Sequence, residues 1–383
     1  MKQLKDLKGS SSLESFLGDD GIMNVERITR KGNLPTNSKP IPEEDLNNMI
    51  EEVFTFWRNE GFPDYPKETK WRDKKFKELE KADIGSLFKN KIIKPHNAGL
   101  SLAWSYMSHH WGIQCGTMKT PEEIFNDDIH FRKGIRKLLT GTFFPKKLLS
   151  DLIPSNASLF EDEDQINSKY RCGSVLRSML MRYSGTQVVS NFRPTAAAVL
   201  YQHFAFPGAN VQDMSMGYGG RILGAIISDV NYIGTDPATE TFKGNTEIAK
   251  QFGRKNRNYQ LHKLGSEVFQ PEEESIDFAF TSPPYFNWEK YSEDEGQSFK
   301  QFSTNEEWNN GFLRKTMENV KRGLKKGKVM AMNVADIKSH KTFEKDTVEL
   351  AKSVGYEHID TFRLQLSSQE SGAKYEPVFI FKK

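Results

Sequence analysis

Glycines and polar residues that could hold a nucleoside ligand follow two apolar stretches in the second half of the chain. Asp213, Ser215, Gly217 and Gly219 lie in DMSMGYGGR, between one apolar stretch and the run ILGAII. Glycines let the backbone approach a ligand closely, and the following helix offers free amides at its first turn. Asp236 ends the next stretch, YIGTDP, about 20 positions later, where an acidic side chain can accept hydrogen bonds from ribose hydroxyls. Together these residues predict a nucleoside-bearing ligand, although the glycines alone also fit a plain tight turn.

The glycine spacing excludes two phosphate-binding motifs. The order of glycines in MGYGGRILG does not match GxGxxG, the dinucleotide fingerprint, and no GK[ST] follows as a phosphate loop requires. A cofactor without phosphates remains. S-adenosylmethionine fits, because its amino acid part needs the glycine turn with an acidic neighbour and its ribose needs Asp236.

A third feature is the stretch AFTSPPYFNW, in which two prolines end an apolar strand and aromatic residues follow. Taken in order, NFRPTAAA, DMSMGYGGR, YIGTDP, LGSEVF and TSPPYFNWEKY resemble the amino-group DNA methyltransferases, which modify N4 of cytosine or N6 of adenine. The resemblance covers roughly residues 190–383. Its most specific element is the [DNS]-P-P-[YFW] tetrapeptide, here SPPY. The cofactor loop departs from the family's common form, which has Phe or Pro after the acidic residue.

The resemblance implies a catalytic segment made of Ser282, Pro283, Pro284 and Tyr285. An exocyclic base amine is a poor nucleophile, because its lone pair is delocalised into the ring. The side chain of Ser282 and the carbonyl of Pro283 would accept its two hydrogens, and the paired prolines keep these acceptors in place. Tyr285 would stack on a base swung out of the duplex. The substrate-binding candidates are the aromatic residues Tyr285, Phe286 and Trp288, with core packing as the alternative for Tyr285 and Trp288.

The same resemblance implies further cofactor contacts from two segments. Phe192 either packs on the adenine of the cofactor or belongs to the core, and Pro194 and Thr195 follow it. Ser266 and Glu267 come after the third strand, where the family often contacts the adenine ring. A surface position is the alternative for Glu267.

Other chemistries fit the sequence less well. Methylation at cytosine C5 would use a Pro-Cys nucleophile, and neither Cys115 nor Cys172 follows a proline. The sequence HHW near Cys115 lacks the spacing of a zinc site, so no metal is expected. In the family that the chain resembles, serine at the first tetrapeptide position is more often associated with cytosine N4, so the resemblance favours this amine, with adenine N6 next.

The elements that must position these residues are strands alternating with helices from about residue 205 onward, which predicts a parallel sheet. Two final strand-like runs, joined by a short connection, are expected to pair antiparallel at one edge. The predicted class is α/β, with a Rossmann-like methyltransferase domain containing a mostly parallel seven-stranded sheet and an antiparallel edge strand. The predicted division is a flexible arm at residues 1–40, a mainly helical domain at 41–188 that could recognise the target, and the catalytic domain at 189–383.

Composition sets wider bounds. The chain has 54 lysines and arginines against 51 acidic residues, a net charge of +3, so DNA binding would need a local basic face. Two cysteines suit a reducing compartment, and no apolar run is long enough for a membrane span, so a cytoplasmic protein is expected.

The sequence predicts a site-specific S-adenosylmethionine-dependent DNA methyltransferase, with a restriction endonuclease as candidate partner. The alternatives are an RNA methyltransferase and a nucleic-acid-binding protein with a vestigial cofactor pocket. The target sequence and oligomeric state are not predicted.

Overall fold

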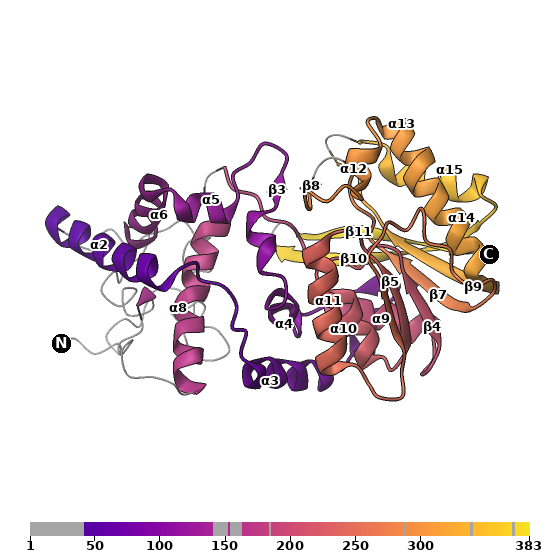
Figure 1. Cartoon of the computed structure of the whole chain (residues 1–383), viewed down its shortest axis with the longest axis horizontal. Coiled ribbons are helices and arrows are strands. Elements are labelled where there is room, and N and C mark those ends of the chain that lie inside the picture. The colour runs from indigo at the N-terminus through magenta and orange to yellow at the C-terminus, as the bar shows by residue number, and fades with distance from the viewer. Residues whose placement is uncertain are drawn as a thin grey trace. The chain divides into compact units, whose positions relative to one another are not determined.

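The computed structural model describes residues 42–140, 152–153, 163–183, 185–286, 289–337, 340–369 and 372–383 (Figure 1). The expected flexible arm, residues 1–40, lies outside this part. The chain divides into two compact units. Met1–Asp64 and Pro121–Thr186 form the helical unit, and Tyr65–Thr120 and Gln187–Lys383 form the sheet unit.

The helical unit is built from amphipathic helices around its own core. Its main helices are α2 (Glu43–Glu60), α5 (Pro121–Asn126), α6 (Asp128–Thr140) and α8 (Glu163–Met181). Helix α2 buries apolar residues at spacings of three and four, which place them on one face. Among them Trp57 is 1% exposed, and its indole N–H donates to the carbonyl of Leu152 at 2.9 Å.

The sheet unit contains a doubly wound parallel core, which confirms the predicted fold class. The parallel strands are β4 (Asn210–Asp213), β5 (Asn231–Thr235), β6 (Tyr259–His262), β7 (Ile276–Thr281) and β9 (Leu324–Asn333). They lie in the order β6-β5-β4-β7-β9, so β4, the first of these five strands along the chain, is at the centre. The chain reverses its direction of winding between β4 and β7. In Rossmann-like sheets, ligands bind outside the carboxyl ends of the strands at this switch point.

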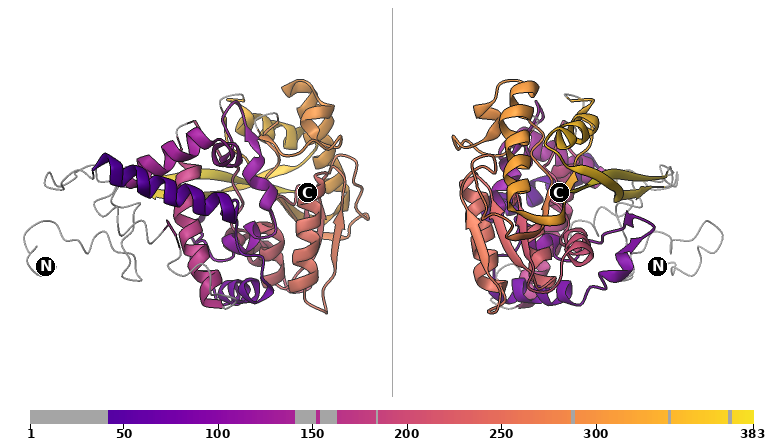
Figure 2. Two further views of the ribbon diagram at one scale, coloured as in Figure 1. Left: turned by 60° about the vertical axis from the view of Figure 1, so that its left-hand side comes forward. Right: turned by 90° about the vertical axis from the view of Figure 1, so that its right-hand side faces the viewer.

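Helices cover both faces of the sheet and create two apolar cores (Figure 2). The first face is covered by α9 (Pro194–Phe204), α10 (Gly220–Ile227) and α11 (Thr239–Phe252), and the second by α14 (Arg314–Gly323) and α15 (Phe343–Ser353). All six residues of β7 are buried. Phe278 and Phe280 pack in the first core and Ala279 in the second, as the alternation of side chains along a strand requires.

The C-terminal strands pair antiparallel as expected, but the order differs from the prediction. Strand β11 (Gly372–Lys382) lies between β9 and β10 (Glu357–Gln369) and runs antiparallel to both. The antiparallel strand is therefore inside the sheet and not at its edge. The edge is extended by β2 (Ile92–Ile93) and β1 (Phe88–Lys89), which gives nine strands in the described residues. Two-residue strands carry no sequence pattern that could have revealed them.

Residues 65–120 correct the expected boundary, because they group with the sheet unit and not with the helical one. Helices α3 (Thr69–Glu80) and α4 (Leu100–Trp104) bury Leu79 and Leu102 in the first core of the sheet. Strand β3 (Gln114–Cys115) pairs with β8 (Glu289–Lys290). The remaining short helical elements are Gly85–Leu87, Ser108–Gly112, α12 (Ser298–Gln301), α13 (Asn305–Trp308) and Asn309–Leu313.

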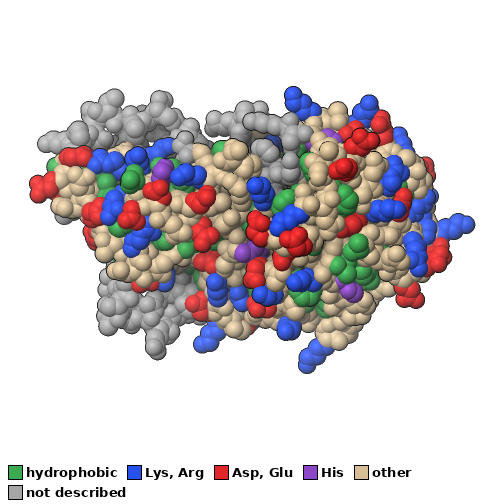
Figure 3. All heavy atoms as spheres, turned by 45° about the horizontal axis from the view of Figure 1, so that its top comes forward, with side chains coloured by type: hydrophobic (Ala, Val, Ile, Leu, Met, Phe, Trp, Pro, Cys, Tyr) green, Lys and Arg blue, Asp and Glu red, His purple; other side chains and the backbone are tan. Residues whose placement is uncertain are grey.

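Two wider features concern the surface and the membrane. On the face drawn in Figure 3, basic and acidic side chains are interspersed, in keeping with the small net charge. In the part of the chain that the structure describes, no helix is both long enough and apolar enough to span a bilayer.

Candidate active site

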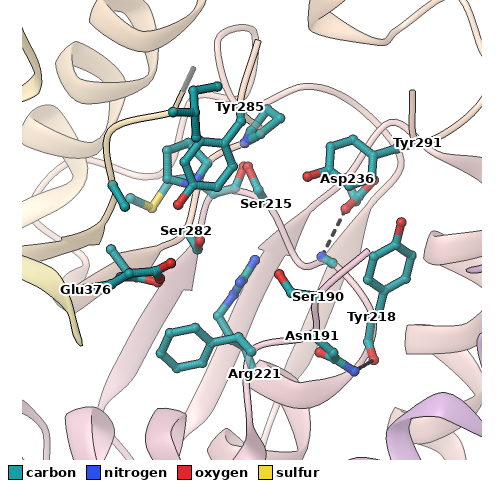
Figure 4. A pocket seen from close by; sticks show the side chains of 18 of the residues that line it. Ser190, Asn191, Ser215, Tyr218, Arg221, Asp236, Ser282, Tyr285, Tyr291 and Glu376 are labelled. Carbon is teal, nitrogen blue, oxygen red and sulfur yellow. Dashed lines mark hydrogen bonds between the residues drawn. The ribbon is translucent and has the colours of Figure 1, made fainter. Parts of the chain in front are cut away.

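A cavity of about 640 Å³ opens at the carboxyl ends of the parallel strands, within the sheet unit (Figure 4). Its lining brings together residues that follow β4, β5, β6, β7 and β9. The predicted site residues among them are Phe192, Ser215, Gly217, Asp236, Ser266, Glu267, Ser282, Pro283, Pro284 and Tyr285. Segments far apart in the sequence therefore share one cavity at the switch point of the sheet.

Asp236 is fixed against the glycine turn by two backbone amides. Gly217 donates to Oδ2 at 3.1 Å, and Ala238 donates to Oδ1 at 3.0 Å. Gly217 has φ of 57°, a left-handed conformation that glycine adopts without strain. Burial raises the pKa of Asp236 to about 6, although both amides oppose this shift. The carboxylate is thus oriented at the cavity and sensitive to pH near neutrality.

The segment before α9 is held tightly against the start of α10. A Cβ atom on Gly220 would lie 1.8 Å from the carbonyl oxygen of Phe192, so only glycine fits there. Asn191 strengthens this contact, because its side-chain amide donates to the carbonyl of Tyr218 at 2.8 Å. The ring of Phe192 packs edge-on against Phe280, with centroids 4.9 Å apart. One side of the cavity is therefore a rigid wall.

Asp213 does not line the cavity, which corrects its expected role as a cofactor contact. It is fully buried, and its Oδ2 accepts hydrogen bonds from Arg221 Nε at 2.7 Å and from the hydroxyl of Tyr232 at 2.6 Å. Its Oδ1 accepts from the amide of Ser215 at 3.1 Å. The carboxylate of Asp213 is therefore already hydrogen-bonded by donors of the protein. Of the ion pair between Asp213 and Arg221, only Arg221 lines the cavity.

The turn after β6 offers an unsatisfied acceptor. Ser266 is buried, and its hydroxyl is paired with that of Thr316 at 2.8 Å. The carbonyls of Ser266 and Glu267 accept from the side-chain amide of Asn319 at 3.2 and 2.9 Å. Oε2 of Glu267 is buried with no hydrogen-bond partner among the described residues, and burial raises the pKa of this carboxyl. A ligand donor in the cavity could satisfy it.

The tetrapeptide at the end of β7 lies at the cavity, but the residue after it does not. Tyr285 packs edge-on against Phe343, with ring centroids 5.7 Å apart, and lines the cavity. Phe286 has φ of 46° and is buried in the second core, with its ring 6.3 Å from that of Trp308. This placement corrects the expectation that Phe286 forms part of the pocket wall. Trp288 lies outside the described residues.

Three other expected cofactor residues do not line the cavity and lie instead at the starts of α9 and α10. Pro194 and Thr195 are buried in the first turn of α9, where the Thr195 hydroxyl donates to the carbonyl of His96 at 2.8 Å. Gly219 precedes α10 with φ of 81°, and a Cβ there would lie 2.6 Å from Ile248. Gly219 thus belongs to the turn that carries Gly217, whereas Pro194 and Thr195 fix the start of α9.

Several cavity residues were not predicted as site residues. Tyr218, Arg221, Tyr291, Asn333 and Glu376 all line the cavity. Glu376 belongs to β11, and burial raises the pKa of its carboxyl. The signal for Arg221 was its place directly after the glycines, whereas nothing near Glu376 in the sequence indicates a site.

The histidines next to Cys115 have other partners. Nε2 of His109 lies 3.1 Å from the hydroxyl oxygen of Thr241, and Nδ1 of His110 lies 2.7 Å from the carbonyl oxygen of Met107. Among the described residues, no group of three or more His, Cys, Asp and Glu side chains is placed to hold a metal ion.

Comparison with known proteins finds likeness in solved structures alone. No protein-family profile and no curated protein matches the chain. A SAM-dependent methyltransferase from Methanosarcina mazei matches 48% of this chain and 96% of its own, at 14% identity and a TM-score of 0.35. A methyltransferase from Pyrococcus furiosus matches 54% of this chain and 93% of its own, at 16% identity and a TM-score of 0.36.

A third solved structure contains ligands. It is the 1,6-didemethyltoxoflavin-N1-methyltransferase of Burkholderia thailandensis, with bound 1,6-didemethyltoxoflavin and S-adenosylhomocysteine. It matches 49% of this chain and 76% of its own, at 13% identity and a TM-score of 0.34. Each likeness concerns about half of this chain, and the Rossmann-like fold rests on the strand order and directions described above.

Proposed function

We propose that this protein is a site-specific DNA methyltransferase, which transfers a methyl group from S-adenosylmethionine to an exocyclic amine of a flipped-out base. One observation carries the proposal. The cavity at the switch point holds both Asp236, fixed beside the glycine turn, and the segment from Ser282 to Tyr285. Its volume of about 640 Å³ lies in the range of small-molecule sites and leaves room for more than one ligand group.

The cavity residues fit a nucleoside cofactor without phosphates. Asp236 would accept hydrogen bonds from the ribose hydroxyls, as its position at the end of the second strand suggests. Glu267 would accept from the adenine amino group through the buried oxygen that has no partner among the described residues. The exposed face of Phe192 would pack on the adenine ring. S-adenosylmethionine, when bound there, supplies a methyl group carried on a positively charged sulfur.

The chain's own residues would then hold and deprotonate the amine. The Ser282 hydroxyl oxygen and the Pro283 carbonyl accept its two hydrogens, and the prolines keep both acceptors in place. Ser282 is neutral, so the proton that leaves the methylated amine needs another acceptor. Glu376 is our candidate, because its carboxyl lines the same cavity and its raised pKa favours proton uptake.

Base recognition would begin with Tyr285. Its ring is braced by Phe343 and lines the cavity, which suits stacking on an extruded base. Cytosine N4 is favoured by the serine of the tetrapeptide, with adenine N6 next. The helical unit is our candidate for reading the target sequence, and a restriction endonuclease is a candidate partner of such an enzyme.

Methyl transfer can be tested directly with labelled cofactor. The pure protein is incubated with S-adenosylmethionine carrying a labelled methyl group and with duplex DNA, single-stranded DNA or structured RNA. We expect label in duplex DNA, and nucleoside analysis then distinguishes N4-methylcytosine from N6-methyladenine. Label in RNA alone would move the proposal to an RNA amine. No transfer to any polymer, together with no cofactor binding by calorimetry and with DNA binding retained, would support the alternative, a nucleic-acid-binding protein with a vestigial cofactor pocket.

A matched variant controls for contaminating activity. Ser282→Ala removes one amine acceptor and leaves Asp236 and Glu267 in place, so it should bind the cofactor normally and transfer little label.

Modification-sensitive sequencing of DNA from cells that express the wild-type protein would identify both the base and the target sequence. An unmodified genome in cells with confirmed expression would count against DNA as substrate.

A further inference from the structure

Arg221 is a buried cation whose donors are only partly used by the protein. It is the second residue of α10, and its side chain is 6% exposed. Its Nε donates to Asp213 at 2.7 Å, which is the one hydrogen bond that this side chain makes among the described residues. Nη1 and Nη2 carry four further N–H groups. Because Arg221 lines the cavity, the acceptors of a ligand bound there could pair with these groups.

The free end of the guanidinium faces the cavity. Figure 4 shows it pointing inward from α10, and Arg221 lines the cavity wall. The rings of Phe192 and Phe280 lie 6.0 and 5.8 Å from its central carbon, where they restrict access of water. A Cβ placed on Gly217 would lie 3.5 Å from Nη2, so this nitrogen lies beside the glycine turn. Nη2 of Arg221 and the carboxylate of Asp236, the proposed ribose acceptor, therefore both lie next to Gly217.

Asp213 holds Arg221 in one orientation. The carboxylate is itself fixed by the Tyr232 hydroxyl at 2.6 Å and the Ser215 amide at 3.1 Å. Its negative charge balances the buried arginine, so the charged guanidinium is stable in the wall of the cavity. A side chain that is already fixed loses little entropy when a ligand binds. The planar fork of arginine matches a carboxylate better than any other side chain.

We infer that Arg221 forms a carboxylate subsite that binds the carboxylate of the cofactor's amino acid part. This inference rests on the proposed function and assigns one end of the same ligand. A molecule that bears ribose hydroxyls and a carboxylate can engage Asp236 and Arg221 together, because both lie against Gly217.

The test compares two ligands that differ in the carboxylate alone. Isothermal calorimetry on the full-length wild-type protein measures Kd for S-adenosylhomocysteine and for its decarboxylated analogue. We expect the analogue to bind about tenfold more weakly or worse, as for loss of a hydrogen bond to a charged group. Equal affinities would overturn the subsite and leave the cofactor assignment intact. Failure to bind either ligand would overturn the proposed function and the subsite with it.

A variant shows whether Arg221 is the source of the preference. Arg221→Met alone would leave the buried charge of Asp213 unpaired, so it is combined with Asp213→Asn. We expect the double variant to bind both ligands with nearly equal Kd. In the control Asp236→Asn, both affinities should fall by the same factor. A wild-type ligand preference in the folded double variant would overturn the inference, and if that variant does not fold, the wild-type comparison still decides.

Discussion

The backbone amide of Gly217 donates a hydrogen bond to Oδ2 of Asp236 at 3.1 Å. This contact joins the turn after β4 to the end of β5. Because the carboxylate is held by the same turn that should receive the amino acid part of the cofactor, the two halves of the binding site cannot move independently. A change at either residue should therefore affect ligand binding across the whole cavity.

Asp236→Asn should abolish a pH dependence of cofactor binding. The pKa of Asp236 is about 6, raised mainly by burial, so the carboxylate becomes protonated as the pH falls from 7 to 5. Protonation removes an acceptor for ribose hydroxyls, and wild-type affinity for S-adenosylhomocysteine should fall by about tenfold over that range. The Asn variant should bind more weakly at pH 7 and show little change, measured by calorimetry. An equal pH dependence in both proteins would contradict this role.

The raised pKa of Asp236 also predicts that the ligand-free protein becomes more stable as the pH falls, whereas cofactor binding becomes weaker. The folded-state pKa of about 6 exceeds the ordinary value of 3.8, so the folded state binds the proton more tightly than the unfolded state. The stabilisation from this group is fully present below pH 3.8 and is lost as the pH rises through about 6. We expect the difference in unfolding free energy between wild type and Asp236→Asn to decrease accordingly from pH 4 to pH 7. Urea titrations at several pH values measure it.

Substitution of two neighbouring aromatic residues, Tyr285 and Phe286, should affect turnover in one case and stability in the other. Tyr285→Ala should lower kcat/KM by roughly tenfold to a hundredfold, because stacking on a base is worth about 1–3 kcal/mol. Its cofactor affinity should stay near that of the wild type. Phe286→Ala should instead lower the free energy of unfolding by about 3 kcal/mol, because it removes a ring from the second core. If Tyr285→Ala loses cofactor affinity as well, the division of roles in the cavity is wrong.

Gly220→Ala should disturb the rigid wall of the cavity. The added Cβ would lie 1.8 Å from the backbone oxygen of Phe192, so α10 or the preceding segment must shift. We expect a loss of about 3 kcal/mol in unfolding free energy and weaker binding of S-adenosylhomocysteine. Gly85→Ala is the matched control, since its nearest neighbour would be 3.6 Å away, and it should change stability by less than about 0.5 kcal/mol. Similar losses in both variants would mean that the close approach at Gly220 is not important.

Glu376→Gln should slow the chemical step without weakening cofactor binding. If the carboxyl takes up the proton that leaves the amine, its loss should lower kcat by about a hundredfold. The acid limb of the pH–rate profile should also disappear, because burial raises the pKa of Glu376 above its usual range. Glu267→Gln is the comparison, and it should change the cofactor Kd more than kcat. A normal pH profile in Glu376→Gln would assign the proton to another acceptor.

The sequence predicted those parts of the fold and site that depend on short contiguous patterns. Strand β7 and the tetrapeptide after it form one run, and its residues Ile276, Phe278, Ala279 and Phe280 indicate a buried strand. The glycine turn and Asp236 were placed at one end of the sheet in the same way, from their spacing in consecutive β–α segments, and Gly217 and Asp236 both line the cavity.

The errors arose where the outcome depends on a distant partner. An acidic residue at a strand end can face a ligand or pair inside the protein, and Asp213 pairs because Arg221 and Tyr232 are there to receive it. Phe286 enters the core because a positive φ turns the chain away after Tyr285. Glu376 reaches the cavity because β11 inserts next to β9, and strand order is not encoded by any local pattern.

The path of the chain through the sheet unit bears on how such proteins diversify. It leaves this unit after Thr120 and returns at Gln187, whose amide donates to the carbonyl of Lys119 at 3.4 Å. Exit and entry are thus adjacent, as at sites that tolerate domain insertion. A different insert could occupy the same interval without changing the register of any strand. Because α2 shares one apolar core with residues 121–186, evolution could exchange these residues only together with the segment that ends at Asp64, while the cavity at the sheet is inherited intact.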